Sequence, residues 1–184
     1  MNKSRCVFVF PLLALVLAFF SCGDSRLESI IQYEKSIRTV INSFEERSMS
    51  DQNSIDNTAL ESLEYMKAIT PVKGGESFQK AAVDYLNFHL KNSSEYHVKA
   101  SRIFQELDKL YASVQQDSVK LSQADSLAQA SKIEDDNQKL EDLNNSYYPR
   151  REELRTRLKE SQKELGNKNN IEFKDIEFIY EGED

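Results

Sequence analysis

The sequence predicts an all-α fold: an elongated antiparallel bundle of about four helices, partly coiled-coil-like, with a short non-helical C-terminal tail. The 184 residues include only five glycines and three prolines, and neither residue type occurs between Gly75 and Pro149. Long stretches without these breakers favour long helices joined by few turns. Apolar residues also recur every three or four positions along most of the chain, which is the helical period.

The first two helices are bounded by polar or turn-forming segments. We expect the first to begin at residue 24 or 25 and to end near residue 47. Glu34 lies on its apolar stripe, where we expect it to pair with a neighbouring base or to extend to solvent. The second helix is expected over residues 55–69, because Pro71 forces the preceding residue out of the helical conformation. Residues 70–75 form the clearest predicted turn.

The last two helices are predicted to be long. The third is expected from residue 76 to about residue 114, with Asn92-Ser93-Ser94 either interrupting it or lying exposed on it. The fourth is expected from about residue 116 to residue 165, and its final leucines have the spacing of a coiled-coil seam. Pro149 should kink or split this fourth helical region.

After residue 165 the sequence no longer predicts a helix. Gly166 has the position of a helix C-cap. In the tail, residues 170–180, Ile171 and Phe173 alternate with charged residues. We expect this tail to cover an exposed apolar end of the bundle rather than to form a sheet.

The N-terminus resembles a bacterial lipoprotein signal peptide. Residues 7–20 are uninterruptedly apolar, which is the size of a signal-peptide core and too short to span a bilayer comfortably. Ser21 then precedes Cys22, as in a lipobox, although Phe19 stands where leucine is usual. This resemblance implies cleavage before Cys22 and lipidation (palmitate or a similar acyl chain) of that residue. The alternative is an ordinary secretory signal cut after Gly23.

Cysteine usage favours lipidation. Cleavage would remove residues 1–21 together with Cys6, and would leave residues 22–184 as a single domain with Cys22 as its sole cysteine. One acyl chain binds a membrane only marginally, whereas two or more anchor a protein stably. The expected membrane partner is therefore reached through the lipid.

The charge balance argues against nucleic acid as a partner. The net charge is −7, and it becomes −9 once Lys3 and Arg5 leave with the signal peptide. An acidic body is unsuited to contacts with phosphates and is repelled by anionic lipid surfaces. A protein partner remains possible, but the sequence does not identify it.

The motifs of common enzymes are missing from the sequence. It contains neither the His-Glu-x-x-His zinc motif nor the Gly-x-Ser-x-Gly elbow, and no phosphate-binding glycine loop. His89 and His97 are eight residues apart and lack the Glu-x-x-His pairing of di-metal bundles, so a packed histidine is the simpler interpretation. A calcium site at Asp135-Asp136 is conceivable. We expect no catalytic residue, no cofactor and no metal.

One aromatic and basic segment allows two interpretations. Tyr147-Tyr148-Pro149-Arg150-Arg151 contains the residue types that anchor interfaces. Alternatively, Tyr147 continues the core stripe while the arginines pair with Glu152 and Glu153. The sequence alone leaves both interpretations open.

Residues 70–88 carry a family resemblance. A Pro-x-x-Gly turn followed by an amphipathic helix ending in Tyr-Leu-x-Phe resembles an uncharacterised family of helical bacterial surface lipoproteins of the spirochaete and Bacteroidetes type. The resemblance implies a lipidated start and a helical body, and it transfers no catalytic residue. The long charged final helix is also similar to that of periplasmic coiled-coil chaperones of the Skp type, which are basic and begin with a strand.

These observations favour a non-enzymatic lipoprotein of the bacterial cell envelope. Its helical body would bind or scaffold other molecules, most naturally at the outer membrane, facing the periplasm or the exterior. One alternative is a periplasmic chaperone-like protein that binds client proteins. Another is a metal- or small-ligand-binding helical bundle that uses His89 and nearby acids.

Overall fold

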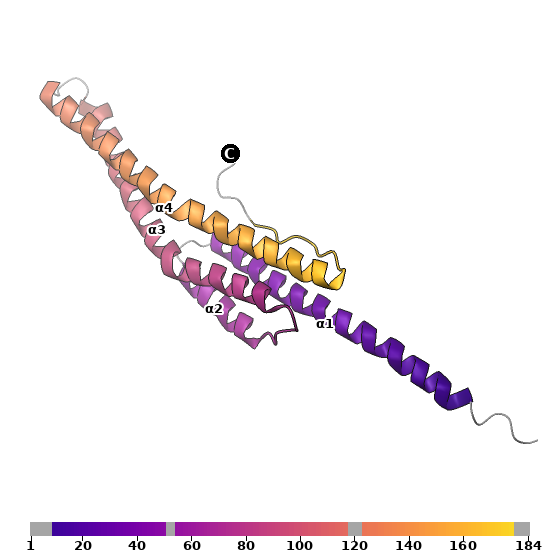
Figure 1. Cartoon of the computed structure of the whole chain (residues 1–184). Helices are drawn as coiled ribbons and strands as arrows, with labels where there is room; N and C mark the ends of the chain where they lie inside the picture. The colour runs from indigo at the N-terminus through magenta and orange to yellow at the C-terminus, as the bar shows by residue number, and fades with distance from the viewer. Residues whose placement is uncertain (1–8, 51–53, 118–122, 179–184) are drawn as a thin grey trace, which may run out of the picture.

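The computed structural model describes residues 9–50, 54–117 and 123–178, and within them it contains helices and no strand. The helices pack against one another in an elongated antiparallel arrangement (Figure 1), which confirms the predicted all-α bundle. Their bounds are α1 Val9–Ser50, α2 Ile55–Ala68, α3 Glu76–Asp117 and α4 Gln123–Asn169.

The molecule has a compact body with a projection at each end (Figure 1). The body consists of α2, the second half of α1, the first half of α3 and the second half of α4. Residues 97–117 of α3 and 123–146 of α4 continue beyond the body as a two-helix projection, called the arm from here on. The N-terminal part of α1 extends from the opposite end.

The start of α1 differs from the prediction. The helix begins at Val9 rather than at residue 24 or 25, and it passes through Cys22 without a break. The physical reason is that Leu, Ala and Phe of the apolar run favour helix at least as well as the polar residues that follow, so nothing stops the helix between them. Within the described part of the chain, no helix is both long and apolar enough to cross a membrane.

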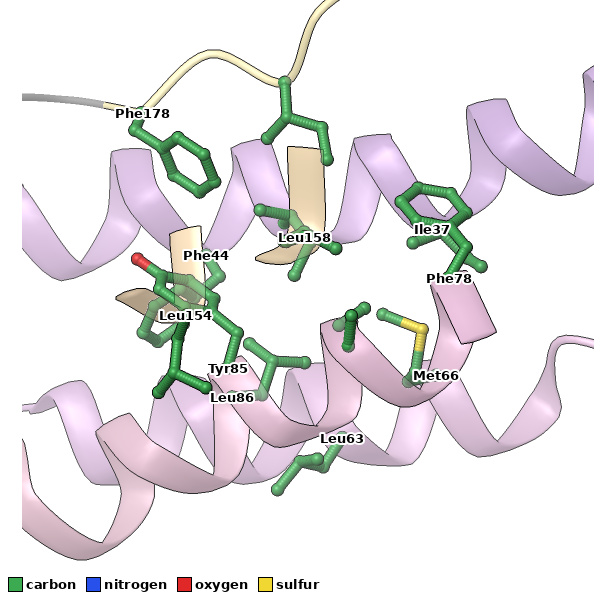
Figure 2. Packing of buried hydrophobic residues seen from close by; sticks show 14 of the residues in the cluster. Ile37, Phe44, Leu63, Met66, Phe78, Tyr85, Leu86, Leu154, Leu158 and Phe178 are labelled. Carbon is green, nitrogen blue, oxygen red and sulfur yellow. The ribbon is translucent and has the colours of Figure 1, made fainter. Parts of the chain in front are cut away.

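The core fills the body, where side chains of all four helices meet (Figure 2). Helical spacing puts one apolar face of each helix toward this centre. Tyr85 and Leu86 of α3 lie close to Leu154 and Leu158 of α4, and all four side chains are buried. The other fully buried large apolar residues are Ile30, Ile37, Ile41, Phe44, Met66, Phe78, Leu165 and Ile176.

The turn between α2 and α3 confirms the predicted break at residues 70–75. Gly74 has a φ of 87°, a conformation that glycine adopts without strain. The Tyr33 hydroxyl donates to the Gly75 carbonyl at 2.8 Å, and a Cβ on Gly75 would meet the Tyr33 ring at 2.5 Å. The Gln79 amide donates to the carbonyls of Met66 and Ile69, which satisfies the end of α2.

α3 and α4 are less interrupted than expected. α3 continues through Asn92-Ser93-Ser94, where Ser93 is buried rather than exposed, and α4 continues across Pro149, which excludes the split but not the kink that was the other expectation. Buried residues on both sides of the proline explain this, because Tyr147 and Leu154 both reach the interior only if the helix continues. The fourth helix begins at Gln123 rather than near residue 116.

Gly166 is not the C-cap, which corrects the prediction. α4 extends to Asn169, and Asn170 adopts the left-handed conformation with a φ of 55°. The Ile171 amide then donates to the Gly166 carbonyl at 2.9 Å, and the Asn170 amide donates to the Asn167 carbonyl at 3.4 Å. This pair of bonds is a Schellman motif, which asparagine can close in place of glycine.

The tail reverses direction and packs back along α4 (Figure 1). Ile176 and Phe178 are buried in the main cluster, and the Gln162 amide donates to the Lys174 carbonyl at 2.9 Å. Phe178 lies beneath the Arg155 guanidinium, 4.9 Å from the ring centroid. The tail therefore covers the bundle as expected; residues 179 and 180 of the predicted segment lie outside the described residues.

Gly166 leads to a prediction about the tail. A Cβ at this position would lie 2.5 Å from the Ile171 carbonyl oxygen and 3.3 Å from the Phe173 ring. Gly166→Ala should lower the free energy of unfolding by about 1–3 kcal/mol, even though alanine usually stabilises a helix interior by about 1 kcal/mol. Urea unfolding followed by circular dichroism measures this change. The exposed Lys163→Ala serves as the control, and a stabilised Gly166→Ala variant would contradict the tail contact.

Candidate functional site

The most unusual feature of the body is an ion pair in its interior. Glu45 of α1 and Arg155 of α4 lie 2.9 Å apart, and each side chain is only 4% exposed. The Tyr85 hydroxyl of α3 donates to the second carboxylate oxygen of Glu45, and the Arg155 Nε donates to the Tyr85 oxygen at 3.4 Å. Three helices that are distant in sequence are thus joined by charged and polar groups away from water.

Arg155 is further satisfied on its outer side. Its Nη1 donates to Glu152 at 2.9 Å, and its guanidinium lies over the ring of Phe178. A buried charge is tolerated when it is paired and hydrogen-bonded on several sides, and becomes very costly when its partner is removed. The network therefore fixes how α1, α3 and α4 sit against one another.

Burial also changes the chemistry of Tyr85. The pKa of its hydroxyl lies well above the usual value, because burial disfavours the phenolate and the Glu45 carboxylate adds to this effect. The hydroxyl therefore remains a hydrogen-bond donor at any physiological pH. This arrangement suits a structural bond and does not prepare Tyr85 to act as a base or nucleophile.

His89 lies next to this network inside a box of aromatic rings. The ring centroids of Phe44, Tyr85 and Phe88 are 4.9, 4.6 and 5.4 Å from that of His89. The His89 Nδ1 is 2.7 Å from the Ser93 hydroxyl, which in turn is 2.8 Å from the Tyr147 hydroxyl. His89 is thus a packed histidine, as the simpler interpretation predicted, rather than a surface ligand.

The box keeps His89 neutral. Burial lowers its pKa well below the usual value, and the positive charges of Arg151 and Arg155 lower it further. Its Nε2 atom is buried without a hydrogen-bond partner. Protonation would put a charge into this box of rings, so the fold favours the neutral form.

Glu34 illustrates the same principle nearer to the other end of the body. Its carboxylate is 2% exposed, accepts from the Arg38 Nε at 2.9 Å and accepts from the Gln162 amide at 2.5 Å. The predicted pairing with a neighbouring base is therefore confirmed. Gln162 joins this α1 carboxylate to the tail, because the same amide donates to the Lys174 carbonyl.

The aromatic and basic segment of α4 is mostly turned inward. Tyr147 is buried and stacks on Tyr96, with centroids 4.3 Å apart. Tyr148 is half-buried beneath the Arg151 guanidinium at 4.8 Å. Arg150 forms an ion pair with Glu153, so the interpretation of the segment as core and helix surface is confirmed.

The remaining predicted ligands are not gathered into one site. Asp136 is buried in the arm and pairs with Lys139 at 2.7 Å, whereas Asp135 is exposed. His97 packs on Tyr96 and is half-buried. In the described ranges, no group of three or more His, Cys, Asp or Glu side chains is placed to hold a metal ion.

Cys22 lies in the first half of α1. Its side chain and the first eight residues of the predicted signal peptide are outside what the structure describes. Residues 25–29 are exposed, and Ile30 is the first buried side chain among those that the structure describes. Cys22 is therefore about two helical turns from the buried Ile30 and about six turns from Glu45 of the buried network.

The sequence did not reveal Glu45, Tyr85 and Arg155 as a group. A weak signal was present, because Glu45 directly follows the core residue Phe44 and Arg155 directly follows the core residue Leu154. Charged residues next to a stripe usually extend to solvent, so partners 110 residues apart are recognised only in three dimensions.

The ion pair leads to a prediction about stability. Arg155→Met should cost about 3–5 kcal/mol, because it leaves the Glu45 carboxylate buried without its charge partner. The double variant Glu45→Leu with Arg155→Met should recover most of this loss, since it removes both charges. Urea unfolding of the two single variants and the double variant forms the cycle, with exposed Arg157→Met as control. Additive single effects would contradict a direct coupling.

His89 leads to a prediction about pH. The lowered pKa means that the unfolded chain binds a proton below pH 6.5 that the folded chain excludes, so the free energy of unfolding should fall as the pH drops below 6.5. One such proton contributes at most about 1.4 kcal/mol per pH unit. His89→Gln should remove this part of the pH dependence between pH 7.5 and 5.5, and His97→Gln should retain it. An unchanged slope in His89→Gln would refute the assignment.

Comparisons with protein-family models, with curated proteins and with solved structures find no match for this chain.

Proposed function

We propose that this chain is a non-enzymatic, lipid-anchored lipoprotein of the bacterial cell envelope, whose body holds the arm away from the membrane for binding or scaffolding. The supporting observation is the placement of the two ends. Cys22 lies in the first half of α1, and the start of α1 and the arm extend from opposite ends of the body (Figure 1). A lipid on Cys22 would thus leave the arm free.

The length of α1 fits the role of a spacer. After cleavage before Cys22, α1 would still extend to Ser50, a rod of about 42 Å at 1.5 Å per residue. Residues 22–29 would separate the membrane surface from the first buried side chain by about 12 Å. The acidic body would then stand clear of anionic headgroups, which its net charge of −9 requires.

The buried network supports a mechanical role. Its charged groups link α1, α3 and α4, so a load on the arm passes through fixed bonds to the helix that carries the anchor. Side chains that are held in such pairs stabilise a rigid arrangement of helices rather than taking part in a reaction. We therefore propose a non-enzymatic function at the outer membrane, with the arm in the periplasm or outside the cell.

One observation favours the chaperone-like alternative as the second candidate. The arm exposes several large apolar side chains, and exposed apolar surface can bind unfolded client proteins. They are Val98, Phe104, Tyr111, Val114 and Leu127. Suppression of client aggregation by the purified chain would support this candidate.

Lipidation can be tested at the mature N-terminus. Mass spectrometry of protein from a bacterium that processes lipoproteins should find Cys22 as the first residue, carrying a diacylglyceryl thioether and an acylated amine. Cys22→Ser should abolish incorporation of labelled palmitate and accumulate the uncleaved chain, while Cys6→Ser should incorporate label normally. A mature chain that begins at Asp24, or an unmodified Cys22, would show that the anchor does not exist.

A further inference from the structure

A groove between α3 and α4 concentrates positive charge on an otherwise acidic chain. It has a volume of about 590 Å³ and lies on the body, next to the start of the arm. Its lining contains one acid, Asp84, and three bases, Lys91, Arg150 and Arg157, which gives it a net charge of +2, whereas the whole chain has −7. A hollow lined mainly by one sign of charge attracts ions of the opposite sign.

Helical spacing aligns these charges along the two walls of the groove. Asp84 and Lys91 are seven residues apart on α3, and Arg150 and Arg157 are seven residues apart on α4. Residues at this spacing lie on one side of a helix, about 10 Å apart along its axis. Bases from both helices are thus gathered over the length of one small molecule.

The ion pairs already present leave these bases available to a ligand. The Arg157 guanidinium and the Asp84 carboxylate are 3.5 Å apart, and the two side chains are 44% and 35% exposed. Arg150 pairs with Glu153, and both side chains are exposed. Within the described part of the chain, no ion pair involves Lys91. Ion pairs at such exposure add little stability, so an anion exchanges with them readily.

Two neutral donors lie between the bases. The side-chain amides of Asn87 and Asn92 both line the groove. Asn92 donates one N–H to the Phe88 carbonyl at 2.8 Å, which leaves its second N–H for a ligand. Phosphate oxygens accept several such bonds at once, and the planar guanidinium of arginine binds them in pairs.

A smaller recess of about 200 Å³ continues from the groove. Because the two hollows share lining residues, one ligand can occupy both; the shared residues are Phe88, Asn92 and Ser146. The rings of Phe88 and Tyr96 flank that of Tyr147, with centroids 5.2 and 4.3 Å away, and all three line the recess. Hollows of roughly 300–1,000 Å³ with an apolar lining and a few polar groups are typical of small-molecule sites.

We propose that this groove binds a phosphate monoester whose organic part contains a ring. The phosphate lies between Lys91, Arg150 and Arg157, and its nearly two negative charges match the net charge of the lining. The ring lies in the recess, where Glu95 and Lys99 neutralise one another at 2.5 Å. This site depends on α3 and α4 alone and not on the proposed lipid anchor.

Nuclear magnetic resonance titration of the full-length chain in detergent, at neutral pH and low salt, tests the site. Phenyl phosphate should shift the side-chain Nε–H signals of Arg150 and Arg157, and it should bind several-fold more tightly than inorganic phosphate, which lacks the ring. Phenol, which lacks the phosphate, should shift neither signal. Because salt screens exposed charges, the affinity for phenyl phosphate should fall at about 0.5 M sodium chloride.

Charge variants test the named residues. Lys91→Gln and Arg157→Gln should each weaken the binding of phenyl phosphate about tenfold. Lys80→Gln on α3 and Lys132→Gln on α4 are matched controls, because they remove the same charge from exposed positions outside the groove. Asp84→Asn should tighten binding several-fold, because it removes the acid from the groove and releases Arg157. A damaged fold does not produce such a gain, and circular dichroism checks the fold of each variant.

Three results would overturn the proposal. One is the absence of shifts at Arg150 and Arg157 with millimolar phenyl phosphate. Another is an equal loss of binding in Lys80→Gln and Lys91→Gln, which would reduce the effect to the overall charge of the chain. The third is tighter binding of glycerophosphoglycerol, a phosphodiester, than of phenyl phosphate, which would assign the groove to lipid headgroups.

Discussion

The buried contact between Glu45 and Arg155 is the constraint on which the arrangement of the helices depends. Glu45 and Arg155 are 110 residues apart along the chain, and α4 packs mainly on α3. The ion pair, together with Tyr85, closes the bundle by joining the helix that would carry the anchor to the helix that returns from the arm. Apolar packing alone tolerates sliding and rotation, whereas a buried pair with several hydrogen bonds requires one register.

The same use of polar groups continues along the interior of the bundle. Glu34 with Gln162 lies toward one end of the body, and His89 with Ser93 and Tyr147 lies where the arm begins. Each group joins at least two elements. The apolar core of the body supplies most of the free energy of folding. The buried polar groups specify which helix faces meet. That precision matters in a molecule in which α3 and α4 extend beyond the core as the arm.

Helical periodicity and the scarcity of glycine and proline were sufficient to predict the four helices, the turn at residues 70–75 and the packing of the tail. The errors arose where tertiary structure overrides local rules. Of the two expectations for Pro149, a kink or a split, the split is excluded, because buried residues on both sides hold α4 together. Gly166 was mistaken for a cap because its real role, close contact with the Ile171 carbonyl, depends on the returning tail. Likewise, pairing of Glu45 with Arg155 has no sequence signature.

The arm and the body obey different physical requirements. In the body, an apolar core and several polar groups are buried, while Ile31, Leu60 and Tyr65 stay exposed on its surface. In the arm, the seam between α3 and α4 contains few buried side chains, and Phe104 and Tyr111 are exposed. The two halves of α3 and α4 thus differ in how far their side chains are enclosed. Because α3 and α4 run without interruption from one half to the other, rigidity built around Tyr85 and Arg155 also determines the direction in which Phe104 and Tyr111 are presented.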